Sequence, residues 1–77
     1  MAQVNSPLPG VFYQRPDPES PPFKVKGDAV AVSDTIGLVE VMKTFIEVKA
    51  EAAGIFADYV TENEAPVQVG DVLARLS

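Results

Sequence analysis

Apolar and polar residues alternate in short stretches along most of the chain. Residues 44–50 alternate for part of their length: in an extended strand Ile46, Val48 and Ala50 would lie on one face, with Glu47 and Lys49 on the other. The short segment 51–53 is compatible with a helix, but Gly54 follows it at once, and no longer window has a helical period. Turn-forming residues separate the stretches at Gly27-Asp28, Ser33-Asp34, Gly54, Glu62-Asn63-Glu64 and Gly70-Asp71. This pattern predicts an all-β domain of short strands.

The pattern is interrupted near the N-terminus by proline. Residues 14–22 contain four of the seven prolines, so this segment is neither a helix nor a central strand. Composition alone is compatible with a disordered linker. The apolar segments 11–13 and 23–25 on either side favour instead a stiff loop that projects between two strands.

Several segments of the first part of the chain recur in the second. Gly10-Val11-Phe12 recurs as Gly54-Ile55-Phe56, Asp28-Ala29 as Glu64-Ala65, and residues 30–36 as residues 67–73, with one extra residue at Pro66. Two copies of a strand-turn-strand unit predict two half-sheets related by a pseudo-twofold axis. Phe12 and Phe56 should then occupy equivalent positions.

The joint between the two copies contains Lys43. Strands 36–42 and 44–50 would pair as a hairpin with Lys43 at or near its tip, where the amine is exposed and sterically free. Considered alone, this is an ordinary solvated lysine in a turn. The neighbouring Met42 is unusual there, because a large, flexible apolar side chain at an exposed tip suits contact with partner proteins.

Composition narrows the classes of function. The chain has 77 residues, enough for one small domain, and it has no Cys and no His. Disulfides, thiolate metal sites and the commonest general base are therefore excluded. The formal net charge is −5 and the six cations form no run, so neither nucleic acid nor an anionic membrane surface is an expected partner.

Targeting signals are not evident in the sequence. Residues 1–10 lack both a basic region and an apolar region of a signal peptide, and no apolar stretch approaches the length of a membrane span. The expected location is cytoplasmic.

Catalysis by this chain alone is not expected. The eleven acidic residues are scattered as on a solvated surface, no Gly-rich phosphate loop is present, and no acidic cluster has the spacing of a metal site. A Ser33–Lys43 dyad would lack the usual activating base.

The segment Glu40-Val41-Met42-Lys43 resembles the Glu-Ala-Met-Lys signature of biotinyl domains, the carrier domains of biotin-dependent carboxylases. The resemblance extends from Ser6 to Leu76 and includes the Gly-Asp turns at 27–28 and 70–71. It implies a covalent biotin joined by an amide to Lys43, with Glu40, Val41, Met42 and Thr44 recognised by the ligase or other partners. Lipoyl domains share the fold, but they usually have Asp before the lysine, where this chain has Met42.

The proline-rich segment carries a second resemblance. Residues 10–23 resemble the thumb of bacterial acetyl-CoA carboxylase carrier proteins, a loop that projects beside the biotin. The thumb-like loop would comprise Gln14, Arg15, Pro16, Asp17, Pro18, Glu19, Ser20, Pro21 and Pro22. We expect a short N-terminal segment, 1–9, followed by a carrier domain, 10–77, that contains this loop.

These resemblances imply a non-catalytic biotin carboxyl carrier protein. The biotin on Lys43, attached by a biotin ligase, would carry a carboxyl group from a biotin carboxylase subunit to a carboxyltransferase subunit. The thumb favours acetyl-CoA as the acceptor, and thus malonyl-CoA formation for fatty acid biosynthesis. The alternatives are a carrier for another acyl-CoA or for a small molecule such as urea or an amide, a lipoyl carrier, and an unmodified interaction module.

The sequence departs from the family pattern at four positions. Val41 and Thr44 replace the usual neighbours of the lysine, Ser33 stands where a turn glycine is usual, and Arg15 replaces a small residue of the thumb. We expect strain at Ser33 and an altered contact between thumb and biotin at Arg15.

The predicted fold is a flattened antiparallel barrel-sandwich of about eight strands with pseudo-twofold symmetry, with the modified lysine on a hairpin between the halves. The predicted core consists of Phe12, Val25, Val30, Val32, Ile36, Leu38, Ile46, Val48, Ile55, Val67, Val69, Val72 and Leu76.

Overall fold

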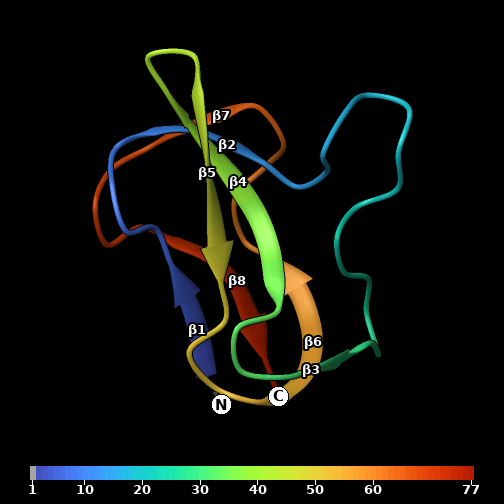
Figure 1. Cartoon of the computed structure of the whole chain (residues 1–77). Helices are drawn as coiled ribbons and strands as arrows, with labels where there is room; N and C mark the ends of the chain where they lie inside the picture. The colour runs from blue at the N-terminus through green and yellow to red at the C-terminus, as the bar shows by residue number, and fades with distance from the viewer. Residues whose placement is uncertain (1) are drawn as a thin grey trace.

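The computed structural model describes residues 2–77 and confirms an all-β architecture, with no helix in that range (Figure 1). The strands are β1 (Ala2–Asn5), β2 (Gly10–Tyr13), β3 (Ala29–Val30), β4 (Thr35–Val41), β5 (Thr44–Lys49), β6 (Gly54–Tyr59), β7 (Ala65–Val67) and β8 (Val72–Leu76). Residues 2–77 therefore offer no helix that could cross a membrane. Residues 51–53, which the sequence left open to a helical turn, form a bend between β5 and β6.

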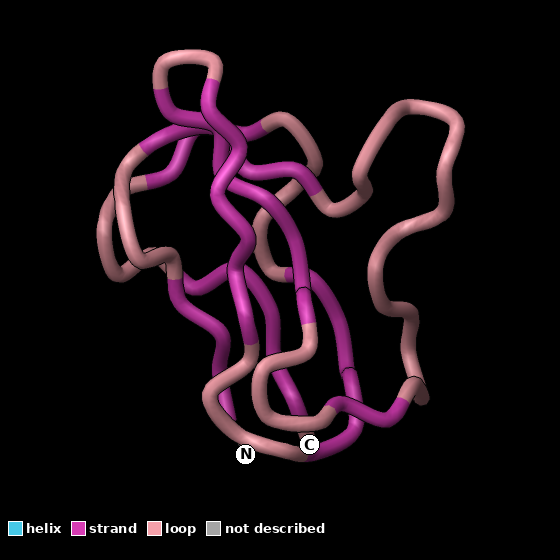
Figure 2. Tube along the Cα trace, in the orientation of Figure 1, coloured by secondary structure: helices cyan, strands magenta, loops and turns pink. Residues whose placement is uncertain are grey.

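The strands form two four-stranded antiparallel sheets that face each other, one in the order β1-β8-β6-β3 and the other in the order β5-β4-β2-β7 (Figure 2). This is the predicted flattened sandwich. Residues 1–9 were predicted to be a separate short segment; within it, Ala2–Asn5 pairs with β8 along the edge of the first sheet. The hairpin of β4 and β5 extends beyond the body of the sandwich, at the end opposite to both chain termini (Figure 1).

The strand orders confirm the pseudo-twofold repeat, because exchanging β1, β8, β6 and β3 for β5, β4, β2 and β7 converts one sheet into the other. The registers agree in detail: Phe12 pairs with Val39, and Phe56 pairs with Leu76. Phe12 and Phe56 are both buried and both contact the ring of Tyr59, so they occupy equivalent positions as predicted.

One detail of the predicted repeat is wrong. The sequence comparison aligned Asp28 with Glu64 and required an extra residue at Pro66. In the structure the amide of Gly27 donates to Phe56 O at 2.9 Å, and the amide of Glu64 donates to Phe12 O at 2.6 Å. Gly27 and Glu64 are therefore equivalent, both have positive φ, and no extra residue is needed.

The core lies between the two sheets. Of the residues predicted to be in it, six are buried: Phe12, Val30, Ile36, Val48, Val67 and Leu76. Leu38 and Val72 are half-buried. The remaining five are exposed, and the prediction is wrong for Val25, Val32, Ile46, Ile55 and Val69.

For three of the five exposed residues, the structure shows the physical cause of the exposure. Val32 and Val69 occupy the same position in equivalent turns, where the chain reverses and the side chain points away from both sheets. Ile46 pairs with the buried Val39, but it lies in the part of β5 that extends beyond the facing sheet. Alternation assigns a face to each residue without showing where the opposite sheet ends.

Several buried residues were missed. A register irregularity between Thr35 and Gly37 places both Ile36 and Val39 in the core, although their spacing would put them on opposite faces of a regular strand. The others that were missed are Val4, Ala50, Phe56, Leu73 and Ala74.

Candidate functional site

The hairpin of β4 and β5 turns through two residues only, Met42 and Lys43. Val41 pairs with Thr44 directly across the turn, and the φ angles of Met42 and Lys43 are 50° and 67°. Positive φ at both central residues is the type I′ arrangement, which matches the twist of the two strands. Asn-Gly is the usual sequence there, so two bulky residues in this conformation store strain at the tip.

Lys43 lies exposed at this tip, in agreement with the predicted hairpin. Within residues 2–77 its amine makes no hydrogen bond and no ion pair. Met42 beside it is 93% exposed, and Thr44 is also exposed. The tip therefore presents a free amine next to apolar surface, an arrangement open to a modifying enzyme.

Glu40 of the same segment is tied to the outer face of the sheet. Tyr13 on β2 donates its hydroxyl hydrogen to Glu40 Oε1 at 2.9 Å, and this bond raises the pKa of the Tyr13 phenol. The ring of Tyr13 meets the ring of Phe45 edge-on at 5.7 Å. Glu40 is thus held in place by the body of the domain, while Val41 next to it is half-buried and packs against the core.

The proline-rich residues lie in the long loop 14–28 between β2 and β3, which projects from the sandwich (Figure 1). Residues of this loop and Phe45 of β5 line a common groove. Residues 14–22 of this loop are the segment predicted to be the thumb. Its tip is ordered by Asp17, whose carboxylate accepts from the Glu19 amide at 3.0 Å and from the Ser20 hydroxyl at 2.9 Å.

A groove of about 320 Å³ lies between the thumb and β5, next to the lysine hairpin. It is lined by Tyr13, Arg15, Pro16, Asp17, Pro18, Phe45, Asn63 and Glu64. Arg15 Nε is buried and has no hydrogen-bond partner within residues 2–77. A buried donor without an acceptor is costly, and a bound group with a carbonyl oxygen would remove that cost.

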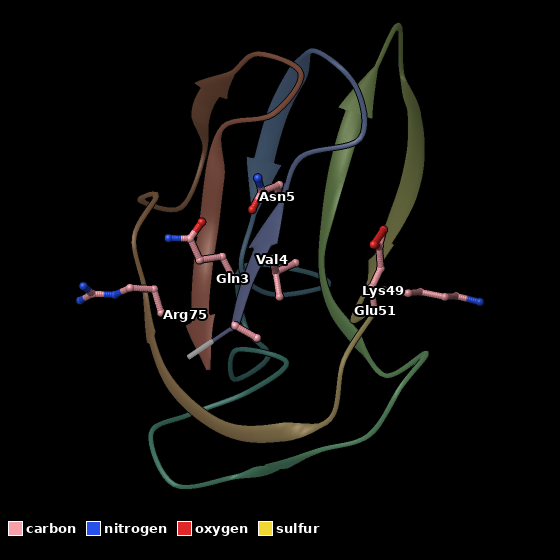
Figure 3. A pocket seen from close by; sticks show the side chains of 7 residues that line it. Gln3, Val4, Asn5, Lys49, Glu51 and Arg75 are labelled. Carbon is pink, nitrogen blue, oxygen red and sulfur yellow. The ribbon is translucent and has the colours of Figure 1, made fainter. Parts of the chain in front are cut away.

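A second hollow, of about 460 Å³, lies between β1 and the end of β5 (Figure 3). Its polar lining includes Gln3 and Asn5 from β1 and Glu51 after β5. Lys49 at its rim is at the opposite end of β5 from the lysine hairpin. This hollow is therefore separate from the candidate site.

Four residues of the site were not predicted from the sequence: Tyr13, Phe45, Asn63 and Glu64. Phe45 carried a usable signal, since it lies two residues from Lys43 and a large apolar residue near an exposed tip is unusual. Asn63 and Glu64 come from a distant turn and carried none. Residues 2–77 hold no cluster of three or more side chains suited to a metal ion.

Comparisons with known proteins agree with this geometry. The biotin carboxyl carrier protein of acetyl-CoA carboxylase from Chlamydia muridarum is 45% identical over 95% of this chain and 45% of the relative. The protein of the same name from Streptococcus pyogenes is 37% identical over 95% of the chain and 44% of the relative. The chain thus spans about half the length of the curated relatives it matches.

A solved structure has the same fold. The crystal structure of the Kluyveromyces lactis urea carboxylase superposes with a TM-score of 0.80 at 26% identity, over 99% of this chain and 6% of that one. A family model described as "Biotin-requiring enzyme" matches residues 2–76. The chain therefore belongs to the biotin/lipoyl domain family of biotin-requiring enzymes.

Proposed function

We propose that the protein is a biotin carboxyl carrier whose biotin is joined by an amide to the side chain of Lys43. The observation that carries this proposal is the position of that lysine, exposed on a two-residue turn of a projecting hairpin, with an amine that makes no hydrogen bond or ion pair within residues 2–77. The match to a biotin-requiring family and the names of the relatives support it. When bound, biotin supplies a ring nitrogen that accepts and releases a carboxyl group.

The chain itself contributes position rather than chemistry. The rigid sandwich fixes the strands of the hairpin, so the lysine stem extends into solvent from a defined point. Tethering raises the local concentration of the attached group at each of two enzyme sites in turn. We propose a biotin ligase, a biotin carboxylase and a carboxyltransferase as partners, and a non-catalytic role for this subunit.

Four neighbours of the lysine have proposed recognition roles. Met42 and Thr44 present exposed side chains to a partner, and Val41 anchors the strand before them. Glu40 has its carboxylate oriented by Tyr13, so a partner meets it in one direction. The thumb is proposed to lie beside the biotin, with Arg15 Nε available to its carbonyl oxygen.

Acetyl-CoA is the proposed acceptor of the carboxyl group, because the relatives from Chlamydia muridarum and Streptococcus pyogenes are named as carrier proteins of acetyl-CoA carboxylase. The structural likeness to urea carboxylase supports the alternative of a small-molecule acceptor. Acceptor choice belongs to the transferase, so an assay that pairs the biotinylated domain with either transferase distinguishes the two.

Replacing the lysine tests the proposal directly. After co-expression with a biotin ligase, we expect the intact mass of the natural chain to increase by one biotinyl group and that of Lys43→Arg to remain unchanged. Lys49→Arg is the matched control, an exposed lysine at the far end of β5 from the lysine hairpin that should leave labelling intact. The unfolding midpoint of Lys43→Arg should equal that of the natural chain, because the Lys43 amine has no hydrogen-bond or ion-pair partner within residues 2–77.

Labelling of Lys43→Arg would contradict the proposal. So would an unlabelled natural chain beside a labelled control domain, since Val41 and Thr44 would then break ligase recognition.

A further inference from the structure

The thumb is attached to the sandwich through contacts with the other half of the molecule. In the second half, the segment equivalent to the long loop 14–28 is the short connection 60–64 between β6 and β7. This short connection is fastened to β8: the Val60 amide donates to Leu73 O at 2.8 Å, and Thr61 Oγ1 donates to Val72 O at 2.8 Å. It therefore forms a fixed support beside the base of the thumb.

Gln14 joins the thumb to that support. Its amide donates to Asn63 Oδ1 at 2.7 Å, and its side-chain Nε2 donates to Thr61 O at 2.9 Å. Its carbonyl accepts from the Phe23 amide at 2.9 Å, which closes the two arms of the loop on each other. Backbone and side chain of one residue thus connect both arms to the second half.

Tyr59 connects the same base to the core. Its ring packs against Phe12 and Phe56, and its hydroxyl donates to Ile36 O at 2.7 Å. The Lys24 amide lies 3.4 Å from the same hydroxyl. Burial raises the pKa of Tyr59 to about 12, so the hydroxyl keeps its hydrogen under ordinary conditions.

The thumb itself is stiff. Prolines restrict its backbone, and Asp17 closes its tip through two hydrogen bonds. A stiff loop fixed at one end moves as a unit about its base. The contacts of Gln14 at this base are therefore in a position to set the width of the groove between the thumb and Phe45.

We propose that Gln14, through Asn63 and Thr61 of the second half, is a positioning residue that holds the thumb against the groove beside Lys43 and so restrains the group attached to that lysine. The inference rests on the proposed function only in its last part. The position of the thumb is a property of the unmodified chain, and it can be measured without biotin.

Amide hydrogen exchange on the unmodified protein tests the first part. In Gln14→Ala and in Asn63→Ala, exchange of the thumb amides and of the Phe23 amide should become about two- to tenfold faster, as expected for the loss of one hydrogen bond. Exchange in β4 and β5 should not change. Gln68→Ala is the matched control, since Gln68 is exposed and its side chain makes no hydrogen bond within residues 2–77.

A conservative variant separates positioning from general damage. Asn63→Asp keeps an acceptor oxygen for the Gln14 amide, so its thumb exchange should stay within about twofold of the natural chain. Equal exchange in Asn63→Ala and the natural chain would overturn the proposal, and so would an increase spread evenly over all strands.

Capture of the biotinylated protein by avidin tests the second part. If the thumb restrains the biotin, the capture rate should rise about two- to tenfold in Gln14→Ala and Asn63→Ala, and it should not rise in Gln68→Ala. Biotin loading of Lys43 should be complete in all three variants. Complete loading with an unchanged capture rate would overturn the inference alone, whereas absent loading would overturn the proposed function.

Discussion

The two halves of the sandwich share a hydrogen-bonding frame down to single turns, yet they differ at the positions that matter for function. In the first half, Asp34 Oδ2 accepts from the Ala31 amide at 2.9 Å. In the second, Asp71 Oδ2 accepts from the Gln68 amide at 2.8 Å. The repeated frame shows which features are required for folding, since each is present twice.

The differences occur at the candidate site. The first half has the thumb where the second has a short connection. Met42-Lys43 joins β4 to β5, whereas no turn within residues 2–77 joins the equivalent strands β8 and β1. A feature present in one half only is not needed by the frame. Departures from the pseudo-symmetry therefore mark residues with another role, and substitutions that exchange one half's residue for the other's test this view.

The largest effect is expected in the core. Gly37 pairs with Val48 and Ala74 pairs with Val4, so the two residues are equivalent. A Cβ at Gly37 would lie 2.5 Å from Phe12 Cε1 and 2.7 Å from Tyr13 O. Gly37→Ala should therefore lower the free energy of unfolding by about 3 kcal/mol.

The reverse exchange, Ala74→Gly, should cost only about 1 kcal/mol, because it removes one methyl group and loosens a strand. Urea unfolding of both variants measures the difference. Equal losses would show that the two halves pack their central strands alike, contrary to the structure.

A smaller effect of opposite sign is expected at the equivalent turns. Ser33 has φ 78° and Gly70 has φ 88°, and their amides donate to Ala50 O and Ser6 O at 2.8 and 2.9 Å. Only the serine has a Cβ that opposes this conformation. Ser33→Gly should raise the free energy of unfolding by about 0.5–1 kcal/mol and Gly70→Ser should lower it by a similar amount, after allowing for the entropy of glycine in the unfolded chain.

Thermal and urea unfolding of these two variants would measure the effect. If both variants are destabilised, the serine at position 33 has a stabilising contact that outweighs its strain.

The smallest effect is expected on the outer faces. In one sheet, Arg75 Nη2 lies 2.6 Å from Asp58 Oδ2 of the neighbouring strand. At the equivalent place in the other sheet, Leu38 lies beside Tyr13. The hydrogen bond from Arg75 lowers the pKa of Asp58, so its contribution to stability is present above the ordinary pKa of an aspartate and is lost as the pH falls through the lowered value.

Both side chains are exposed, so this contribution is small and screened by salt. Arg75→Leu, which copies the residue of the other half, should leave the unfolding midpoint at neutral pH within experimental error. It should also flatten the dependence of the midpoint on acid pH at low salt. A large loss at neutral pH would contradict the view that the outer faces are free to differ.

The sequence predicted the features that depend on local pattern. Alternation located β5, glycine and aspartate located the turns, and the repeat gave both the twofold relation and the place of Lys43 between the halves. The strain expected at Ser33 is present as a positive φ. These features follow from residues close together in the chain.

Features that depend on distant packing could not be predicted. The irregularity in β4 that buries Val39 has no local signal, and neither has the end of the facing sheet that leaves Ile46 in solvent. The turn at Met42-Lys43 adopts a conformation for which its sequence is unusual. The hydrogen bond between the base of the thumb and Asn63 joins two segments far apart in the chain, and neither segment alone has a pattern that predicts it.

The pairing of Ala2 with Leu76 has a consequence for how such a domain can be built into larger molecules. Entry and exit of the chain lie side by side, at the end of the sandwich away from the lysine (Figure 1). A host protein could therefore receive the domain within one surface loop without separating the ends of that loop. In that arrangement the lysine would point away from the host protein.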